Sequence, residues 1–396
     1  MMQKKKECVN LKLMNKKIFP FFLIFIIIFI IEFLSYVASS LNLLIFNDPP
    51  NVYLKKPNQN LKNYWNEKEI WGAWHEKNFQ VRHVKECFDI EYKTNEIGAR
   101  DDPFIKINKE NNIILLGDSF AEGYGIEKDS MFETKIEKLT NKTVLNFSSS
   151  KDFGLIQYIL IYENLAKNYN HNTIIISFLP NNDFKDNDFI FYKENKLDFL
   201  NKKQRHRPYY IKSENGYKIL FPKKDKENSI ELVEFLKKYF WSSNVLRTIK
   251  YLYISYKLKK AKKKLLKNYS KDKKTEHITD YYFTPQHQQE AIVFFLQKFI
   301  KENSKKNILL FSIPLYEDYE IVKNNDYRDN IFWWKKIKSF ENKYKNFHFL
   351  DLIDYATENY KDYFFPNKCD GHWNREGHQW AGKIISEHLL EFDDLK

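Results

Sequence analysis

The stretch that decides the fold is Ile113-Ile114-Leu115-Leu116-Gly117-Asp118-Ser119-Phe120. Four consecutive aliphatic residues are typical of a strand that is buried on both faces. Gly117 permits a tight turn directly after this strand, so that Ser119 lies at the carboxyl end with backbone N–H groups beside its hydroxyl. A strand, a turn and a helix in this order can present a nucleophile and part of an oxyanion-binding site. The same triplet also occurs in ordinary turns.

The chain that follows alternates short apolar runs with segments of helical periodicity, which is the pattern of a parallel α/β sheet. Five strands with interleaved helices predict a flavodoxin-like doubly wound sheet, in which active sites gather at the carboxyl ends of the strands. The expected strands are 113–116, 143–147, 173–178, 307–313 and 347–352. The expected helices are 131–139, 155–169, 286–302, 330–344 and about 375–391, the last capped by Asn374.

A long insertion between residues 184 and about 284 lacks this alternation, and we expect it to be largely helical. Within it, residues 250–274 carry eleven lysines interleaved with leucines. This segment is interpreted as a solvated basic helix. A helix that lies on anionic lipid, or a basic lid over an acidic polymer, is the alternative.

A single apolar segment stands near the N-terminus. Residues 18–37 read IFPFFLIFIIIFIIEFLSYV, with Glu32 as their one charge, and are long enough to cross a hydrocarbon layer of roughly 30 Å. Six lysines precede the segment and the first basic residue after it is Lys55. This asymmetry predicts a cytoplasmic tail at 1–17, a single-pass anchor and an extracytoplasmic remainder, periplasmic or at the cell surface. A linker at 47–64 would join the anchor to a catalytic domain at 65–396.

A cleaved signal peptide is the alternative, with Val37-Ala38-Ser39 as its small-residue site. The length of the apolar stretch and the further apolar residues at 41–46 favour a retained anchor. Glu32 lies near the outer end of the span. It is interpreted as a carboxylate that snorkels to the surface rather than as a functional intramembrane group.

A second motif, Cys369-Asp370-Gly371-His372-Trp373-Asn374, stands directly before the last expected helix. His372 has a carboxylate two positions earlier and a helix cap two positions later, which indicates that these neighbours fix the placement of its imidazole. His378 falls within the helix and is expected to be structural. No His-Glu-x-x-His motif or His/Cys cluster occurs, so neither a metal nor a cofactor is expected.

Four motifs together resemble the conserved blocks of the GDSL/SGNH hydrolases. The resemblance covers about 112–195 and 307–391, and 94–101 resembles the lead-in segment of membrane-anchored members of that superfamily. In chain order the four motifs are Gly117-Asp118-Ser119-Phe120, Asn146-Phe147-Ser148-Ser149-Ser150-Lys151-Asp152, Pro180-Asn181-Asn182-Asp183 and Asp370-Gly371-His372.

The resemblance implies a role for each site residue. Ser119 would be the nucleophile, His372 the general base, and Asp370 the carboxylate that orients the imidazole. The oxyanion would be bound by the Ser119 N–H, the Asn182 side chain and the Lys151 N–H. Lys151 replaces the usual glycine of its block, and a lysine disfavours positive φ if the turn is left-handed.

The implied activity is a serine-dependent hydrolysis of O-acyl esters on envelope polysaccharide or lipid outside the membrane. The one-residue spacing between Asp370 and His372 also resembles alginate-type O-acetyltransferases of the same superfamily. An O-acyltransferase that modifies a cell-envelope glycan is therefore an alternative. A catalytically silent, membrane-tethered glycan-binding module is another, although the complete set Ser119, Asp370 and His372 argues against it.

The net charge limits the classes of partner, and the cysteine content limits the possible disulfides. The net charge of +13 favours anionic surfaces, but the expected outside location and the absence of a recognised motif argue against nucleic acid. The sequence does not specify the oligomeric state. Of the three cysteines, Cys8 falls on the reducing side, so Cys87 and Cys369 are predicted to form a disulfide in the oxidising compartment. Two buried unpaired thiols are the alternative.

Overall fold

The computed structural model describes residues 2–47, 50, 61–68, 70–104, 112–194, 207–221, 235–236, 238–253, 256, 279–324, 328–365 and 370–394. The chain forms two compact units. One consists of Met1–Gln59 and Lys226–Lys274, and the other of Asn60–Asp225 and Thr275–Lys396. The predicted sheet and Ser119 belong to the second unit.

A five-stranded parallel sheet forms the centre of the second unit, in the order β11-β10-β7-β5-β6. Numbered along the chain, this is the order 2-1-3-4-5 of flavodoxin-like sheets. The predicted fold class is therefore confirmed. The strands are β5 (Ile113–Leu116), β6 (Val144–Asn146), β7 (Thr173–Phe178), β10 (Asn307–Ser312) and β11 (Phe347–Asp351).

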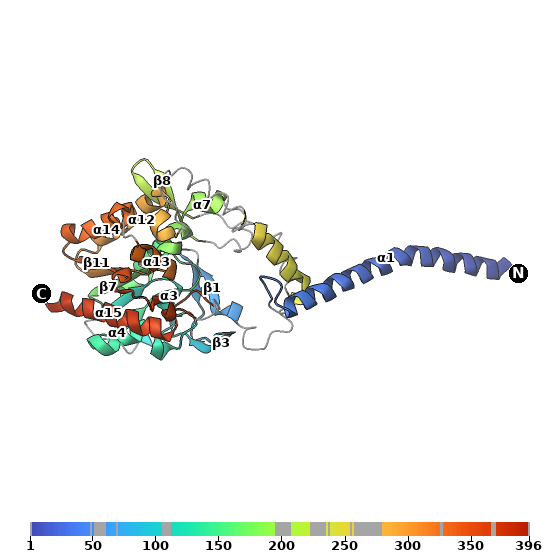
Figure 1. Cartoon of the computed structure of the whole chain (residues 1–396), viewed down its shortest axis with the longest axis horizontal. Helices are drawn as coiled ribbons and strands as arrows, with labels where there is room; N and C mark the ends of the chain where they lie inside the picture. Colours follow the sequence, from blue (N-terminus) through green and yellow to red (C-terminus); the bar gives the residue numbers. More distant parts are fainter. Residues whose placement is uncertain are drawn as a thin grey trace. The chain divides into compact units, whose positions relative to one another are not determined.

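Helices cover both faces of this sheet (Figure 1). Alternate side chains of β5 belong to opposite core clusters, because successive residues of a strand point to opposite faces. One face packs against α4 (Phe132–Thr140) and α15 (Arg375–Asp394). The other packs against α5 (Leu155–Asn164), α12 (Gln286–Glu302) and α14 (Phe332–Lys343). Shorter helices are α3 (Ser119–Glu122), α6 (Pro180–Asp186), α11 (Asp280–Phe283) and α13 (Tyr316–Asn324).

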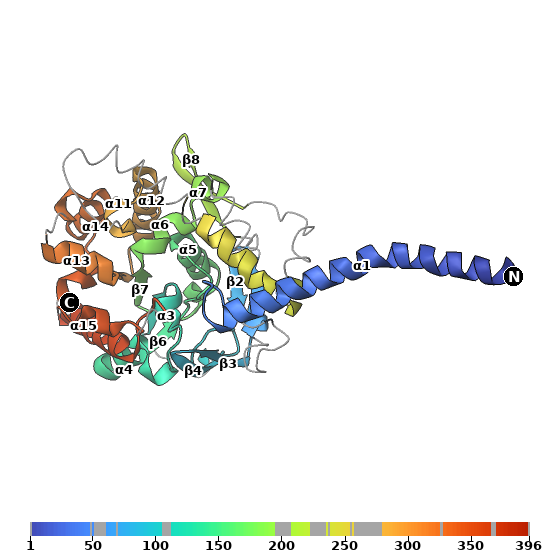
Figure 2. The same ribbon diagram turned by 45° about the vertical axis from the view of Figure 1, so that its right-hand side comes forward.

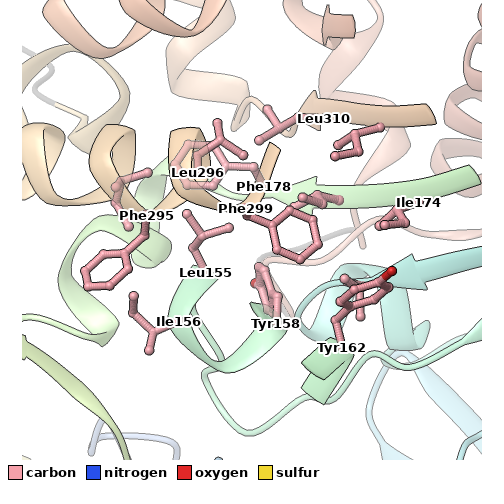
Figure 3. Packing of buried hydrophobic residues seen from close by; sticks show 14 of the residues in the cluster. Leu155, Ile156, Tyr158, Tyr162, Ile174, Phe178, Phe295, Leu296, Phe299 and Leu310 are labelled. Atoms are coloured by element: carbon pink, nitrogen blue, oxygen red, sulfur yellow. The ribbon is translucent and has the colours of Figure 1, made fainter. Parts of the chain in front are cut away.

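The larger core cluster lies where α5 and α12 meet the sheet (Figure 3). Tyr158 of α5, Phe299 of α12 and Ile174 of β7 are each at most 1% exposed. Burying one large apolar side chain contributes about 1.5–3 kcal/mol, so this cluster fixes the helices on the sheet. The sheet in turn fixes the loops at its carboxyl edge.

Two antiparallel hairpins precede the sheet, and the sequence did not reveal them. They pair β1 (Trp65–Lys68) with β2 (Gly72–His75), and β3 (Gln80–Lys85) with β4 (Phe88–Lys93). The turn between β3 and β4 is Glu86-Cys87, which lacks the Asn-Gly or Asp-Gly signal of a hairpin. A small cluster around Tyr64 and Tyr92 buries one face of the second hairpin.

The described part of the insertion contains helices and also one antiparallel hairpin that was not predicted. It includes α7 (Phe189–Glu194) and a helix at 242–253, and the hairpin pairs β8 (Tyr209–Ser213) with β9 (Gly216–Leu220). Asn215-Gly216 between alternating residues is a hairpin signal, and Gly216 has a φ of 116°. Apart from residues 250–253 and 256, the lysine-rich segment 250–274 lies outside the described residues.

The first unit contains α1 (Met2–Ser40). Its part Pro20–Ser40 has a mean hydropathy of 2.7 and is long and apolar enough to cross a membrane. A signal sequence has the same length and composition. The predicted tail, anchor, linker and domain boundaries remain predictions.

The tight packing around Gly117 yields the first prediction. A Cβ atom at Gly117 would lie 2.6 Å from the Ala121 Cβ and 2.7 Å from the Ser177 Cβ. Gly117→Ala should therefore lower the free energy of unfolding by about 1–3 kcal/mol through overpacking. Gly371→Ala is the matched control, because a Cβ there meets nothing within 4 Å. Thermal unfolding followed by circular dichroism measures both variants. Equal midpoints for the two would contradict this packing.

Candidate active site

Ser119 is the first residue of α3, directly beyond β5. The Asp118 carboxylate caps this short helix by accepting the Phe120 N–H at 3.0 Å. Ser119 itself is half-buried, whereas Asp118 and Phe120 are buried. The turn therefore presents the hydroxyl at the carboxyl edge of the sheet, between β6 and β7.

His372 is held in the segment that precedes α15. Trp373 is fully buried and bridges to Phe364. The Asn374 side chain donates to the Asp362 and Phe364 carbonyls at 2.6 and 3.0 Å and accepts the Gly377 N–H at 3.0 Å. Asn374 is thus the helix cap that the sequence predicted. These contacts on the carboxyl side fix the backbone that carries His372.

The structure brings Ser119, His372 and Asp370 into one hydrogen-bonded series. The Ser119 Oγ lies 2.6 Å from the His372 Nε2. The His372 Nδ1 makes a short hydrogen bond to the Asp370 Oδ1, which also accepts the His372 backbone N–H at 3.2 Å. With Nδ1–H donating to the carboxylate, Nε2 is free to accept the serine proton. A serine hydroxyl, an imidazole and a carboxylate hydrogen-bonded in this order can carry out acyl transfer.

Lys85 of β3 also belongs to this site, although no local pattern of residues indicates it. Its Nζ lies 2.5 Å from the Asp370 Oδ2, on the side of the carboxylate away from His372. Burial alone would raise the pKa of the Asp370 carboxyl, but the hydrogen bond from His372 and the Lys85 ammonium outweigh burial and hold that pKa well below its ordinary value. Asp370 therefore stays ionised at every pH at which the protein would work.

Two aromatic rings contact the imidazole. The ring centroid of Tyr124 lies 4.6 Å from that of His372, and the Phe120 ring lies 4.9 Å away. Tyr124 also contacts the Lys85 ammonium, 5.1 Å from its ring centroid. These apolar surfaces restrict rotation of His372 and shield its bond to Asp370 from water.

The lead-in segment supports the turn that carries Ser119. The buried Arg100 guanidinium donates to the Glu122 carbonyl at 2.8 Å and also to the Gly123 and Ile126 carbonyls. Its guanidinium carbon lies 4.1 Å from the ring centroid of Tyr92. The carbonyl of the last residue of α3 and two carbonyls beyond this helix thus converge on one side chain.

The Glu122 carboxylate ties the same turn to the N-terminal hairpins. It pairs with the His75 Nε2 at 3.3 Å, accepts the Tyr64 hydroxyl at 3.2 Å and accepts the Ser150 N–H. Burial would raise the pKa of Glu122, but His75 and the other donors outweigh burial and lower the pKa to about 2. The carboxylate therefore remains charged and fixed.

Asn182 lies on α6, directly after β7. Its Nδ2 donates to the Asp186 Oδ2 at 3.1 Å, and its side chain also contacts the Asp118 carboxyl. Because Asp118 precedes Ser119, the amide lies beside the proposed nucleophile. Burial raises the pKa of Asp118 to about 7. The buried Asp183 accepts the Leu179 N–H and the Tyr158 hydroxyl, both at 2.9 Å.

Lys151 lies in the turn after β6. The left-handed residue of this turn is Asp152, with a φ of 51°, and not Lys151. The backbone at Lys151 is therefore compatible with its side chain, and the strain of a positive φ falls on Asp152. Its Nζ lies 4.2 Å from the Trp65 ring centroid, and its carbonyl accepts from Arg207 at 3.0 Å.

Cys87 is disulfide-bonded. It lies in the turn between β3 and β4, two residues after Lys85. Cys369, its predicted partner, lies outside the described residues, so the Cys87–Cys369 bond stays a prediction. Such a bond would join the hairpin of Lys85 to the residue before Asp370.

His378 has a structural contact. Its Nδ1 accepts the Phe132 N–H at 3.2 Å and its ring stacks on that of Phe132, which joins α15 to α4. Burial lowers the pKa of His378 to about 3, so the ring is neutral. Within the described parts of the chain, no group of three or more His, Cys, Asp or Glu side chains is placed to hold a metal ion.

The chain was compared with known proteins. No family model and no curated protein matches it. It is similar to a solved lipolytic protein of the G-D-S-L family from Desulfitobacterium hafniense DCB-2, with 12% identity, a TM-score of 0.33, and coverage of 70% of this chain and 98% of that one.

Two further solved structures show similarity of the same degree. A lipase/acylhydrolase from Enterococcus faecalis has 10% identity and a TM-score of 0.34 over 70% of this chain and 95% of that one. A carbohydrate esterase family 2 enzyme from Corynascus thermopiles has 11% identity and a TM-score of 0.34, with coverage of 72% of this chain and 67% of that one. GDSL-type proteins and carbohydrate esterases are thus among the structural neighbours. Similarity at these TM-scores carries no argument on function, which rests on the site itself.

The position of Lys85 yields a prediction. Lys85→Met should lower kcat by about fivefold to tenfold with little change in KM, because Lys85 positions a carboxylate that acts through His372. Removing the Lys85 ammonium also takes a positive charge away from the Asp370–His372 pair, which favours protonation of the pair and moves the acid limb of kcat toward higher pH. Lys93→Met is the matched control on the same hairpin, since Lys93 is exposed and pairs with Glu91. An unchanged pH profile in Lys85→Met would refute the role.

The oxyanion site yields another prediction. Asn182→Ala should lower kcat on the order of a hundredfold, because it removes one donor to the developing charge. Asn181→Ala on the same helix is the control and should retain activity. Lys151→Gly should retain activity as well, because glycine keeps the backbone N–H. Steady-state kinetics on a p-nitrophenyl ester separates the three variants, and equal rates for Asn181→Ala and Asn182→Ala would remove Asn182 from the site.

Proposed function

We propose that this chain is a serine-dependent ester hydrolase that acts outside the membrane on O-acyl esters of envelope polysaccharide or lipid. The observation that carries the proposal is the hydrogen-bonded series of Ser119, His372 and Asp370, with Ser119 Oγ and His372 Nε2 at 2.6 Å. A base within this distance of a serine hydroxyl is the arrangement that activates the hydroxyl as a nucleophile.

Acylation begins when the Ser119 Oγ attacks the ester carbonyl. His372 Nε2 takes the serine proton as the new C–O bond forms, and Asp370 stabilises the imidazolium. The tetrahedral intermediate then collapses, the bond from carbon to the alcohol oxygen breaks, and His372 returns the proton to the departing alcohol. The acyl group remains on Ser119.

Deacylation repeats these steps with a second oxygen nucleophile. His372 removes a proton from water, and the hydroxide oxygen attacks the acyl carbon. Collapse then releases the carboxylic acid and returns the proton to Ser119. The low pKa of Asp370 supports this cycle, because an ionised carboxylate is required in both halves.

The negative charge on the intermediate needs donors on the opposite side from His372. We assign this role to the Ser119 N–H, the Asn182 amide and the Lys151 N–H, which follow β5, β7 and β6 respectively. The carboxyl ends of neighbouring parallel strands meet at one edge, so the three segments converge there. One such donor is worth about 3 kcal/mol.

The proposed location rests on α1. We interpret Pro20–Ser40 as a retained anchor, with the lysines before it in the cytoplasm and the site outside. We therefore assign esters of envelope polysaccharide or lipid as the substrates. No cofactor enters any step, and the proposed partners are the ester substrate and the membrane.

An O-acyltransferase is the second candidate. The observation that favours it is the single residue between Asp370 and His372, a spacing that resembles O-acetyltransferases of the superfamily. The chemistry differs only in the acceptor, because a sugar hydroxyl would then replace water in deacylation. The same serine, base and oxyanion donors would serve both reactions.

The full chain in detergent micelles tests the proposal with p-nitrophenyl esters from acetyl to octanoyl. Ser119→Ala should lower kcat at least about a thousandfold while the protein stays folded. Ser339→Ala, on the exposed side of α14, is the control. Added glycan distinguishes the two acceptors: acyl groups recovered on the glycan indicate a transferase, and free acid alone indicates a hydrolase. Undiminished turnover in Ser119→Ala would refute the proposal, and glycan binding without turnover would indicate the silent module.

A further inference from the structure

The only charged residue in the apolar part of α1 is Glu32, and the first unit of the structure gives it partners. Its carboxylate accepts the backbone N–H groups of Trp241 at 2.7 Å and Ser242 at 3.3 Å. These N–H groups stand at the start of the helix at 242–253, which belongs to the insertion. The helix lies against the carboxyl end of α1 in both views (Figures 1 and 2).

The depth of Glu32 follows from helix geometry. Lys16 and Lys17 end the basic tail, so the apolar stretch begins at Ile18. From Ile18 to Glu32 an α-helix rises by about 21 Å, which is less than a hydrocarbon layer of about 30 Å. In a membrane-spanning α1, Glu32 therefore lies about 9 Å below the outer boundary. A charged group at this depth is unfavourable unless partners satisfy it.

The helix at 242–253 supplies hydrogen-bond donors to the Glu32 carboxylate, and the carboxylate supplies an acceptor to the first turn of that helix. The first N–H groups of a helix have no partner within the helix, and its N-terminus carries partial positive charge. One carboxylate satisfies both requirements without water. Trp241 also packs edge-to-face on Tyr36 of α1, with ring centroids 5.2 Å apart.

Polar groups are paired along the rest of this contact. Asn244 donates to the Ser39 Oγ at 3.2 Å, and both residues are buried. The Thr248 Oγ1 accepts the Ile45 and Phe46 N–H groups at 3.2 and 3.4 Å, just beyond the end of α1. The contact thus runs from Glu32 outward, with the N-terminus of the second helix as its deepest point.

Part of the remaining surface of the second helix is apolar and exposed. Leu246, Ile249, Leu252 and Tyr253 are 50–59% exposed. Their spacing of three, three and one residues places them on one face of the helix. Leu34 of α1 is similarly exposed, at 58%. In a membrane-spanning α1, an exposed apolar side chain such as Leu34 faces lipid, and the packing of the second helix on α1 would place its exposed apolar residues in the same lipid.

We propose that residues 238–253 form a second membrane-embedded element, which is anchored on Glu32 and places its apolar face among the acyl chains of the outer leaflet. The snorkelling interpretation of Glu32 is replaced, because its partners come from the protein. The inference rests on a retained α1 and not on the esterase activity.

Depth-dependent quenching of the full chain in nanodiscs of anionic and zwitterionic lipid tests this. Single cysteines at Ile249 and Leu252, in a Cys8→Ser background, carry an environment-sensitive fluorophore, and unsubstituted protein is the blank. A label at Lys336, an exposed residue of α14, is the control. Lipid-borne nitroxides should quench the first two labels at least about threefold more than the control, and aqueous iodide at least about threefold less.

Two Glu32 variants test the anchoring contact. Glu32→Ala should expose the labels to iodide, whereas Glu32→Gln keeps an acceptor for the two N–H groups and should protect them. Equal quenching at residues 249, 252 and 336, unchanged quenching in Glu32→Ala, or a mature chain lacking α1 by mass spectrometry would each overturn the proposal. Hydrolysis of a soluble p-nitrophenyl ester by the same samples reports on the active site separately.

Discussion

The buried carboxylate of Glu122 joins the segments that position Ser119. Glu122 is the last residue of the short helix that begins with Ser119. Its carboxylate binds His75 and Tyr64 from the N-terminal region and the Ser150 N–H from the turn after β6. Because the carboxylate is charged and fully buried, each of these donors must stay in place or leave an unpaired charge. The N-terminal hairpins are thus a structural part of the unit that carries Ser119 rather than an appendage to the sheet.

A comparable arrangement orders the other half of the site. Asp370 binds His372 with one oxygen and Lys85 with the other, so β3 contributes to a site otherwise built at the carboxyl edge of the sheet. The two hairpins therefore reach the site by two routes, one through Glu122 and one through Asp370. A disulfide between Cys87 and Cys369 would add a third connection, which would join the turn between β3 and β4 to the residue before Asp370.

Local patterns explain what the sequence could predict. Four aliphatic residues before Gly117 identify the central strand, and Asn374 identifies the start of α15, because each signal involves adjacent residues. Lys85 was missed because its partner lies 285 residues away. Glu32 was read as an isolated charge for the same reason, since Trp241 lies 209 residues away. A buried pairing between distant polar residues leaves no periodicity in the chain.

The central claim is that Ser119 is a nucleophile activated by His372, and covalent trapping tests it most directly. A fluorophosphonate reacts only with an activated serine, and peptide mass spectrometry then locates the adduct. The account predicts a single phosphonyl group on Ser119 of the folded full chain and none in the His372→Ala variant. An adduct on another residue, or an unlabelled Ser119 in protein that still hydrolyses esters, would contradict it.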